Sequence, residues 1–200
     1  MFGKIKTTFS HFRKEDFSPW SGRNEAIIIF AAWAVPAFLF ILLVHLLAKY
    51  RSVEYFTQAI AEGIGPHLWN VIGVFGFFLF GAALLFPSRT YLAFAANRIL
   101  VNTYAIGSLM FGILFGQLVT GLSNATLEKW KLWLFGFAFV VLFLVVFIIN
   151  LFTWYLSFLI YCEKGKTSFI SKIEQLGVGS RIAISLLIML LPVCLMFAER

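Results

Sequence analysis

The sequence predicts an all-α integral membrane protein, a bundle of about five transmembrane helices with the N-terminus in the cytoplasm. Of the 200 residues, 61% are hydrophobic and only 12% are charged, a composition far from that of a soluble globular chain. Several long stretches carry no charge, and a helix needs roughly 20 apolar residues to cross a bilayer core about 30 Å thick. The lipid bilayer is therefore the first expected partner of this chain.

Residues 1–25 form a cytoplasmic segment that precedes the bundle. Four apolar residues in this segment recur at spacings of three and four, which places them on one stripe of a helix: Phe2, Ile5, Phe9 and Phe12. Lys6 and Arg13 flank the stripe, where their charges can reach anionic headgroups. The pattern predicts an amphipathic helix in the membrane interface. The alternative is an unstructured tail in which this spacing arose by chance.

Residues 26–198 are expected to form the transmembrane bundle as one domain. The predicted spans cover residues 26–48, 66–86, 99–122, 132–157 and 182–198. The first span contains Pro36 near its middle, where a bend is expected. The fourth lies in an uncharged run from Leu132 to Cys162, which exceeds the bilayer thickness and must tilt or extend into the interface. The fifth is the shortest and contains Pro192.

The segments between the spans set the expected topology. Residues 90–98 mix aromatic and small side chains and are assigned to the interface, and residues 167–176 are predicted to form a short surface helix that ends at Gly177 and Gly179. Eleven of the 16 Lys and Arg residues fall in the N-terminal segment and in the second and fourth connections. Because positive charge favours the cytoplasmic side, these segments are expected in the cytoplasm of a cell with an inner membrane.

Charged side chains are expected only in tails, loops and helix ends. All nine carboxylates fall there, and no Lys or Arg lies deep in a predicted span. Intramembrane charges commonly mark proton relays and ion paths, so a charge-driven pump is not expected. The motifs of membrane metalloproteases, serine hydrolases and nucleotide-binding loops are also missing, which predicts a protein that is not an enzyme. The basic residues do not form one face, which argues against a nucleic-acid partner.

Histidine and cysteine offer one weaker interpretation. His45 and His67 fall near the outer ends of adjacent spans, and the glycines after His67 leave room for a flat cofactor, so a bis-histidine haem is an alternative. Interfacial histidines that form hydrogen bonds are the more common case, and we expect no cofactor and no metal. Cys162 and Cys194 are expected at different depths, which argues against a disulfide between them.

Small residues on the third span form the best-defined pattern. They recur at intervals of four and share one helix face, as a ridge: Ser108, Gly112, Gly116 and Thr120. Small side chains let two helix backbones approach closely, which favours helix association in lipid. The ridge is predicted to form the closest helix contact, either within the chain or, in a homo-oligomer, between chains.

Three uncharged amides fall inside the predicted spans. Asn102 and Gln117 lie in the third span, and Asn150 lies in the fourth. Such groups prefer hydrogen-bond partners inside a bundle, so they are expected to tie helices together. The alternative is that they line a narrow aqueous path.

Three functions remain open from the sequence. The leading hypothesis is a non-enzymatic inner-membrane protein that acts by helix assembly, as a permeability-altering effector in toxin or antiviral defence. The second is an immunity or accessory protein that binds a membrane-inserted partner, such as a pore-forming bacteriocin. The third is a small subunit of a transporter or respiratory complex. Membrane depolarisation on overproduction distinguishes the first hypothesis from the second.

Overall fold

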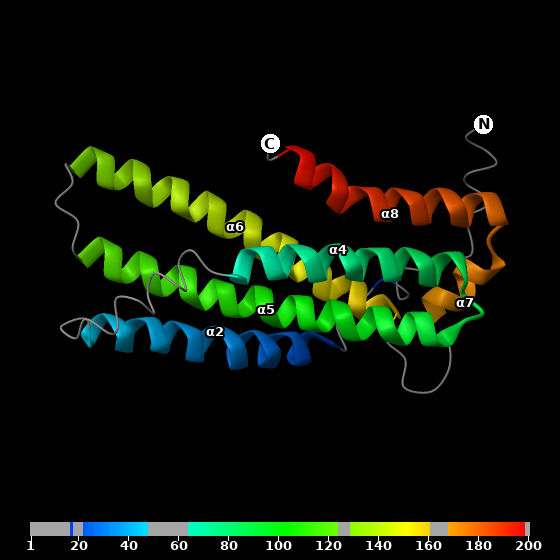
Figure 1. Cartoon of the computed structure of the whole chain (residues 1–200), viewed down its shortest axis with the longest axis horizontal. Coiled ribbons are helices and arrows are strands. Elements are labelled where there is room, and N and C mark those ends of the chain that lie inside the picture. The colour runs from blue at the N-terminus through cyan, green and yellow to red at the C-terminus, as the bar shows by residue number, and fades with distance from the viewer. Residues whose placement is uncertain (1–16, 18–21, 48–63, 124–128, 161–167, 199–200) are drawn as a thin grey trace. The chain divides into compact units, whose positions relative to one another are not determined.

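A computed structural model describes residue 17 and residues 22–47, 64–123, 129–160 and 168–198, and all regular secondary structure in these ranges is helical (Figure 1). Only the backbone is described at residues 64–67, 122–123, 129 and 195–198. The helices are α2 (Arg23–Leu46), α4 (Ile64–Leu85), α5 (Thr90–Ser123), α6 (Lys129–Ile160), α7 (Ser168–Gln175) and α8 (Val178–Ala198). Of these, α2, α4, α5 and α6 are long and apolar enough to cross a membrane. The chain is thus an all-helical protein with the character of a membrane bundle.

The fifth predicted span corresponds to α8. The part of α8 from Val178 to Cys194 is an apolar helix and is not among the four candidate spans. Pro192 lies inside the helix and is buried. A full crossing by α8, and the side of the membrane on which the N-terminus lies, stay predictions.

Helix α5 begins nine residues before the start of the predicted third span. The sequence places residues 90–98 in the interface, but they continue the helix from Thr90. Burial explains the difference, since Ala96, Asn97 and Leu100 are buried at spacings of one and three residues on one face of α5. The added turns therefore pack against protein.

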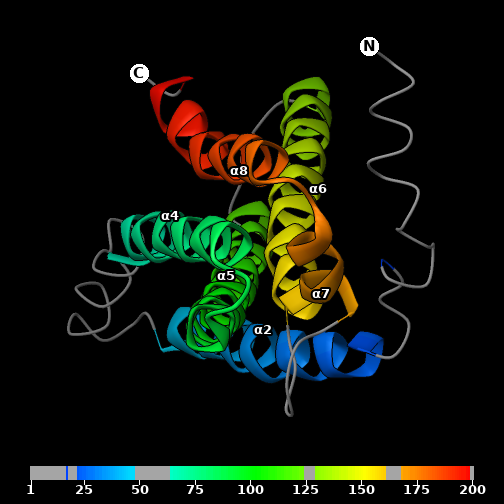
Figure 2. The same ribbon diagram turned by 90° about the vertical axis from the view of Figure 1, so that its right-hand side faces the viewer.

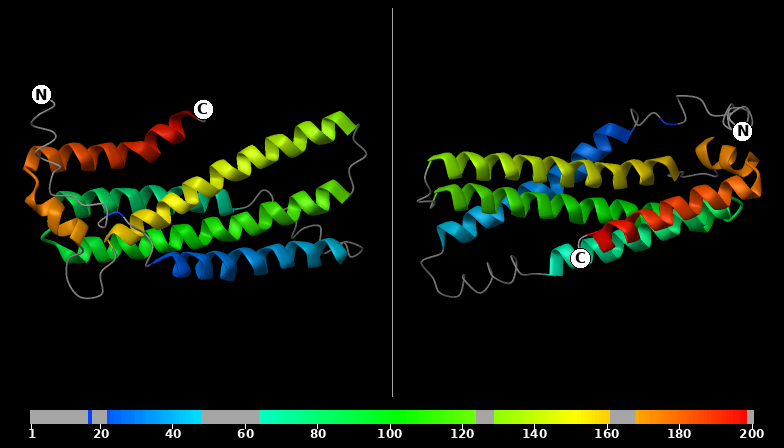
Figure 3. Two further views of the ribbon diagram at one scale, coloured as in Figure 1. Left: turned by 180° about the vertical axis from the view of Figure 1, so that it is seen from behind. Right: turned by 90° about the horizontal axis from the view of Figure 1, so that it is seen from above.

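The chain divides into two compact units, described here separately. Unit 1 contains Met1–Asn24, Asn70–Thr103 and Thr153–Arg200, and unit 2 contains Glu25–Trp69 and Tyr104–Phe152. Helices α4, α5 and α6 each contribute one part to each unit. In both units α5 lies beside α6 (Figure 3).

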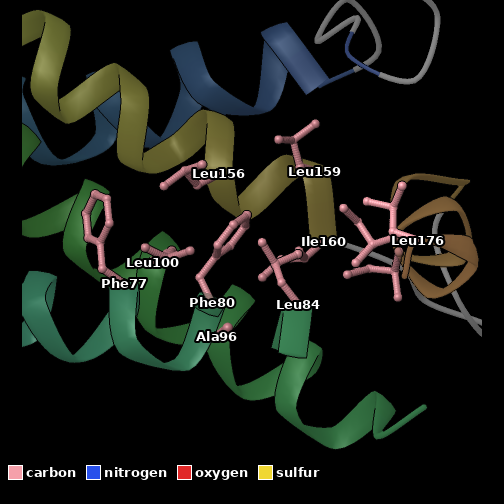
Figure 4. Close-up of a cluster of buried hydrophobic side chains, with 11 residues drawn as sticks. Phe77, Phe80, Leu84, Ala96, Leu100, Leu156, Leu159, Ile160 and Leu176 are labelled. Carbon is pink, nitrogen blue, oxygen red and sulfur yellow. The ribbon is translucent and has the colours of Figure 1, made fainter. Parts of the chain in front are cut away.

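A continuous apolar cluster forms the core of unit 1 (Figure 4). It joins α4, α5, α6 and α7 through Phe77, Phe80, Leu84, Ala96, Leu100, Leu156, Leu159, Ile160, Ile170, Ile173 and Leu176. The short helix α7 turns two isoleucines into this cluster, as expected for an amphipathic helix. The side chain of Asn97 on α5 adds a polar tie, because its Nδ2 donates to the backbone oxygen of Ser157 on α6 at 3.0 Å.

One end of unit 1 gathers several chain connections (Figure 2). The α4–α5 turn, the end of α6, and α7 all lie there. Phe17 is also at this end, since its ring packs edge-on against Phe169 at 5.9 Å and its backbone oxygen accepts a hydrogen bond from Tyr155. A common end for these segments is what the predicted topology requires.

Unit 2 is held by aromatic contacts on one side of α6. Phe143 and Phe147 of α6 pack against Phe111 of α5, which in turn contacts Phe30 of α2. In contrast to residues 150–160, no residue from 130 to 149 is buried. This part of α6 therefore uses one face for protein contacts and presents the rest of its apolar surface outward.

Candidate helix-packing and polar site

The glycine ridge of α5 faces α2 within unit 2. A Cβ atom added at Gly112 would meet the backbone oxygen of Ala34, and would lie 2.9 Å from the Cβ atom of Ala37. A Cβ atom at Gly116 would lie 2.7 Å from the Cβ atom of Ile41. Both distances are too short for real side chains, so only glycine permits this approach of the two helices. The contact that the ridge makes is therefore within one chain.

Hydroxyl groups mark the two ends of the ridge. Ser108 is fully buried, and its Oγ donates to the backbone oxygen of Tyr104 at 2.7 Å. Thr120 is half-buried, and its Oγ1 donates to the backbone oxygen of Gly116 at 3.0 Å. Each hydroxyl bonds one turn back on its own helix, which satisfies a polar group without requiring water.

Asn150 connects α6 to the first turn of the ridge. The residue is fully buried, and its Nδ2 donates both to the backbone oxygen of Tyr104 and to the Oγ of Ser108, each at 3.2 Å. The hydroxyl of Tyr104 donates in turn to the backbone oxygen of Ala26 on α2 at 3.0 Å. These hydrogen bonds link α6, α5 and α2 in unit 2, as expected for an amide inside a helix bundle.

Gly107 is the point of α5 where a fourth helix approaches this polar cluster. A Cβ atom at Gly107 would collide with the Asn150 side chain and would lie 2.9 Å from the Nε1 atom of Trp69 on α4. The Trp69 Nε1 atom is buried and has no hydrogen-bond partner among the described residues. An indole N–H and an amide thus both lie over Gly107, where any larger residue would displace them.

The other two predicted amides have different environments. Asn102 is exposed on α5, whereas Gln117 is half-buried. The structure therefore brings Asn150 together with Ser108, and it leaves Asn102 outside the polar cluster. Asn97 and Ser157, which tie α5 to α6 in unit 1, were not singled out by the sequence analysis.

Several other predicted residues give no site geometry. His45 is exposed near the end of α2, and the side chain of His67 lies outside the described residues, as do Phe2, Ile5, Phe9 and Phe12. The haem alternative and the interfacial N-terminal helix consequently stay predictions. In the described part of the chain, no three His, Cys, Asp or Glu residues lie close enough together to hold a metal ion.

Three residues of the polar cluster were missed from the sequence. Tyr104 continues the interval of four but is not a small residue, Gly107 lies off that interval, and Trp69 resembled an interfacial aromatic residue. A signal was present in the spacing of Tyr104 and Ser108, which places their side chains on one face. That Trp69 lies beside Gly107 could not be predicted from spacing, because it depends on which helices are neighbours.

Comparison with known proteins adds no relative to this description. No protein-family model matches the chain, and neither a curated protein nor a solved structure is significantly similar to it. The arrangement must be interpreted by its own chemistry. Its amides and hydroxyls form hydrogen bonds, and these groups and the indole have no acid or base character at neutral pH, so they are suited to joining helices.

Proposed function

We propose that this protein is a non-enzymatic, multi-pass inner-membrane protein that acts by helix assembly with further copies of itself, as a permeability-altering effector in toxin or antiviral defence. The observation that carries the proposal is the contrast among the three asparagines of α5 and α6. Asn97 and Asn150 are buried and hydrogen-bonded to the neighbouring helix, whereas Asn102 is exposed.

Asn102 is exposed well inside the length of α5 and not at an end of the helix. It lies twelve residues after the start of the 34-residue helix α5, or about 18 Å along the helix axis. An amide that faces hydrocarbon gains free energy when it finds a hydrogen-bond partner on another helix. A second copy of the chain supplies such a partner, the same amide, and a symmetric contact can pair the two.

The surface of α6 supports lateral association as well. On the face away from its Phe143 and Phe147 contacts, Trp133 is 82% exposed, Phe137 is 70% exposed and Ile148 is 63% exposed. These residues share one side of the helix along about 20 Å of its length. In lipid this surface can pack against another helix or against acyl chains, and the polar contact at Asn102 would select the partner.

The test compares Asn102→Leu with the parent and with Val119→Ala, a change at an exposed apolar position of the same helix. A cysteine replaces Ile106, one turn from Asn102, in a chain in which Cys162 and Cys194 are serine. We expect disulfide crosslinking between parent chains in native membranes and depolarisation of overproducing cells. Asn102→Leu should weaken association by about 3-fold to 18-fold, the range of single interhelical hydrogen bonds in membranes.

The outcomes separate the candidate functions. Equal crosslinking and depolarisation in the parent and Asn102→Leu would contradict assembly through Asn102, and Val119→Ala should behave as the parent. Crosslinking without depolarisation would favour the immunity or accessory function. A chain that is degraded unless other proteins are co-produced would favour a subunit of a larger transporter or respiratory complex.

A further inference from the structure

A hydrogen-bond donor and an acceptor from two different helices meet over Gly107 of α5 in unit 2. A Cβ atom added at Gly107 would collide with Oδ1 of Asn150 on α6 and would lie 2.9 Å from Nε1 of Trp69 on α4. Both polar atoms are thus close to the same point beside the α5 backbone. Because glycine contributes no side chain there, the two helices can bring these atoms together.

The hydrogen bonds of Asn150 determine which end of its amide faces Trp69. The Nδ2 atom donates to the backbone oxygen of Tyr104 and to the Oγ of Ser108. A backbone oxygen can only accept, so the NH₂ group must lie on that side of the amide. The atom over Gly107 is therefore the carbonyl oxygen of Asn150, an acceptor, and its neighbour is an indole N–H, which can only donate.

The donor of this complementary pair is not satisfied by protein. The Nε1 atom of Trp69 is buried and has no hydrogen-bond partner in the part of the chain that the structure describes. A buried N–H without an acceptor raises the free energy of the folded state. The carbonyl oxygen of Asn150 has two lone pairs and can accept from a bridging molecule in addition to any other bond that the residue makes. A small molecule that both accepts and donates fits between them.

The surroundings favour water as that molecule. Tyr104, which accepts from Asn150, donates through its hydroxyl to the backbone oxygen of Ala26 in the first turn of α2. The adjacent Glu25 is exposed, and the Trp69 side chain itself is only half-buried. The polar cluster of unit 2 therefore extends to a charged helix end, where water is available. Buried waters typically bridge polar groups that protein leaves unsatisfied, at a small entropic cost.

We propose that one ordered water molecule is bound between Nε1 of Trp69 and Oδ1 of Asn150. It accepts from the indole N–H and donates to the amide oxygen. This water joins α4 to the hydrogen bonds that link α2, α5 and α6 in unit 2. Trp69 is then a polar tie of the bundle and not only an apolar side chain at the start of a span.

Nuclear magnetic resonance of the whole chain in lipid nanodiscs, isotope-labelled at the indole nitrogens, tests the proposal. The N–H signal of Trp69 is identified by its loss in Trp69→Phe. In the parent we expect this signal to show cross-relaxation with water. Asn150→Leu removes the acceptor and should abolish that cross-relaxation. Asn97→Leu is the matched control, because Asn97 is the buried asparagine of unit 1, and it should leave the Trp69 signal as in the parent.

The parent decides the proposal even if Asn150→Leu does not fold. A Trp69 signal without cross-relaxation to water would overturn it, whether the indole is bonded directly to Oδ1 or not bonded at all. Persistence of the cross-relaxation in a folded Asn150→Leu chain would overturn it as well, and an unchanged signal from the buried Trp154 of unit 1 would show folding. Ser108→Ala removes the hydroxyl next to Asn150. Cross-relaxation that persists in this variant supports bound water, whereas its loss would assign the effect to the hydroxyl and overturn the proposal.

Discussion

The two units of this chain differ in what the glycines at their helix contacts face. In unit 1, the atoms nearest to Cβ atoms added at two glycines of α4 belong to side chains: Cγ of Met189 lies 2.7 Å from the one at Gly81, and a terminal methyl of Leu100 lies 3.0 Å from the one at Gly76. The backbone oxygen of Ser185 follows at 3.1 Å from Gly81. In unit 2, Gly112 faces the backbone oxygen of Ala34. A flexible side chain can yield to an added atom and a helix backbone cannot, so unit 2 should be the less tolerant of substitution.

The largest expected effect is at the ridge of unit 2. Gly112→Leu and Gly116→Leu would force α5 and α2 apart, because a Cβ atom at Gly112 would meet the backbone of Ala34 and one at Gly116 would meet the buried side chain of Ile41. Overpacking of this kind destabilises by about 1–3 kcal/mol, and the larger loss is expected at Gly112, where the opposing group is backbone. Unfolding in detergent, followed by circular dichroism, measures the change. Leu114→Ile, a change of shape at a half-buried position off the ridge, is the control. Parental unfolding midpoints in both leucine variants would show that the helices do not depend on this contact.

An intermediate effect is expected when the buried asparagine that connects α5 and α6 is replaced in either unit. Asn150→Leu removes hydrogen bonds to Tyr104 and Ser108 and places a larger apolar group over Gly107, whereas Asn97→Leu removes a bond to the backbone of Ser157. Interhelical hydrogen bonds in membranes average about 0.6 kcal/mol and reach about 1.7 kcal/mol. We expect Asn150→Leu, in unit 2, to lower the free energy of unfolding by an amount near the upper value. Asn97→Leu, in unit 1, should lower it by an amount near the mean. The reverse order, measured by the same unfolding experiment, would contradict the comparison.

The smallest effects are expected where unit 1 has room. The nearest atom to a Cβ at Gly73 is the Cγ2 atom of Thr103 at 3.5 Å, an ordinary contact. Gly73→Ala should therefore be neutral or stabilise α4 by up to about 1 kcal/mol through helix propensity. Gly81→Ala should cost more than Gly73→Ala, because the Met189 side chain must change rotamer and the backbone oxygen of Ser185 would lie 3.1 Å from the added atom. A large destabilisation by Gly73→Ala would show that α4 is closer to α5 than described.

The helices were largely predictable because their signal is local. Apolar length alone gives α2, α4 and α6 within a few residues of their ends, and the short helix predicted for residues 167–176, before Gly177 and Gly179, corresponds to α7. The start of α5 was misplaced because residues 90–98 have the composition of an interface. Their continuation as a helix depends on burial of Ala96 and Leu100 by other parts of unit 1, which is information that the segment itself does not contain.

The site was predictable in its residue types and not in its pairings. A stripe of small residues predicts a close helix contact, and the structure supplies α2 as the partner of Gly112 and Gly116. Nothing in the spacing distinguishes Asn102 from Asn150, since both are single amides in apolar helices. Their different burial follows from which side of each helix meets a neighbour.

Gly22, just before α2, makes a contact that can form only late in synthesis. A Cβ atom at Gly22 would lie 2.8 Å from the Phe158 ring and 3.0 Å from the Trp154 ring, so the backbone at Gly22 is fitted closely against the end of α6. The ribosome makes about 5–20 residues per second, so these rings are added on the order of ten seconds after Gly22. Until then Gly22 cannot make this contact, so the helix that follows it exists without this packing while the rest of the chain is being made.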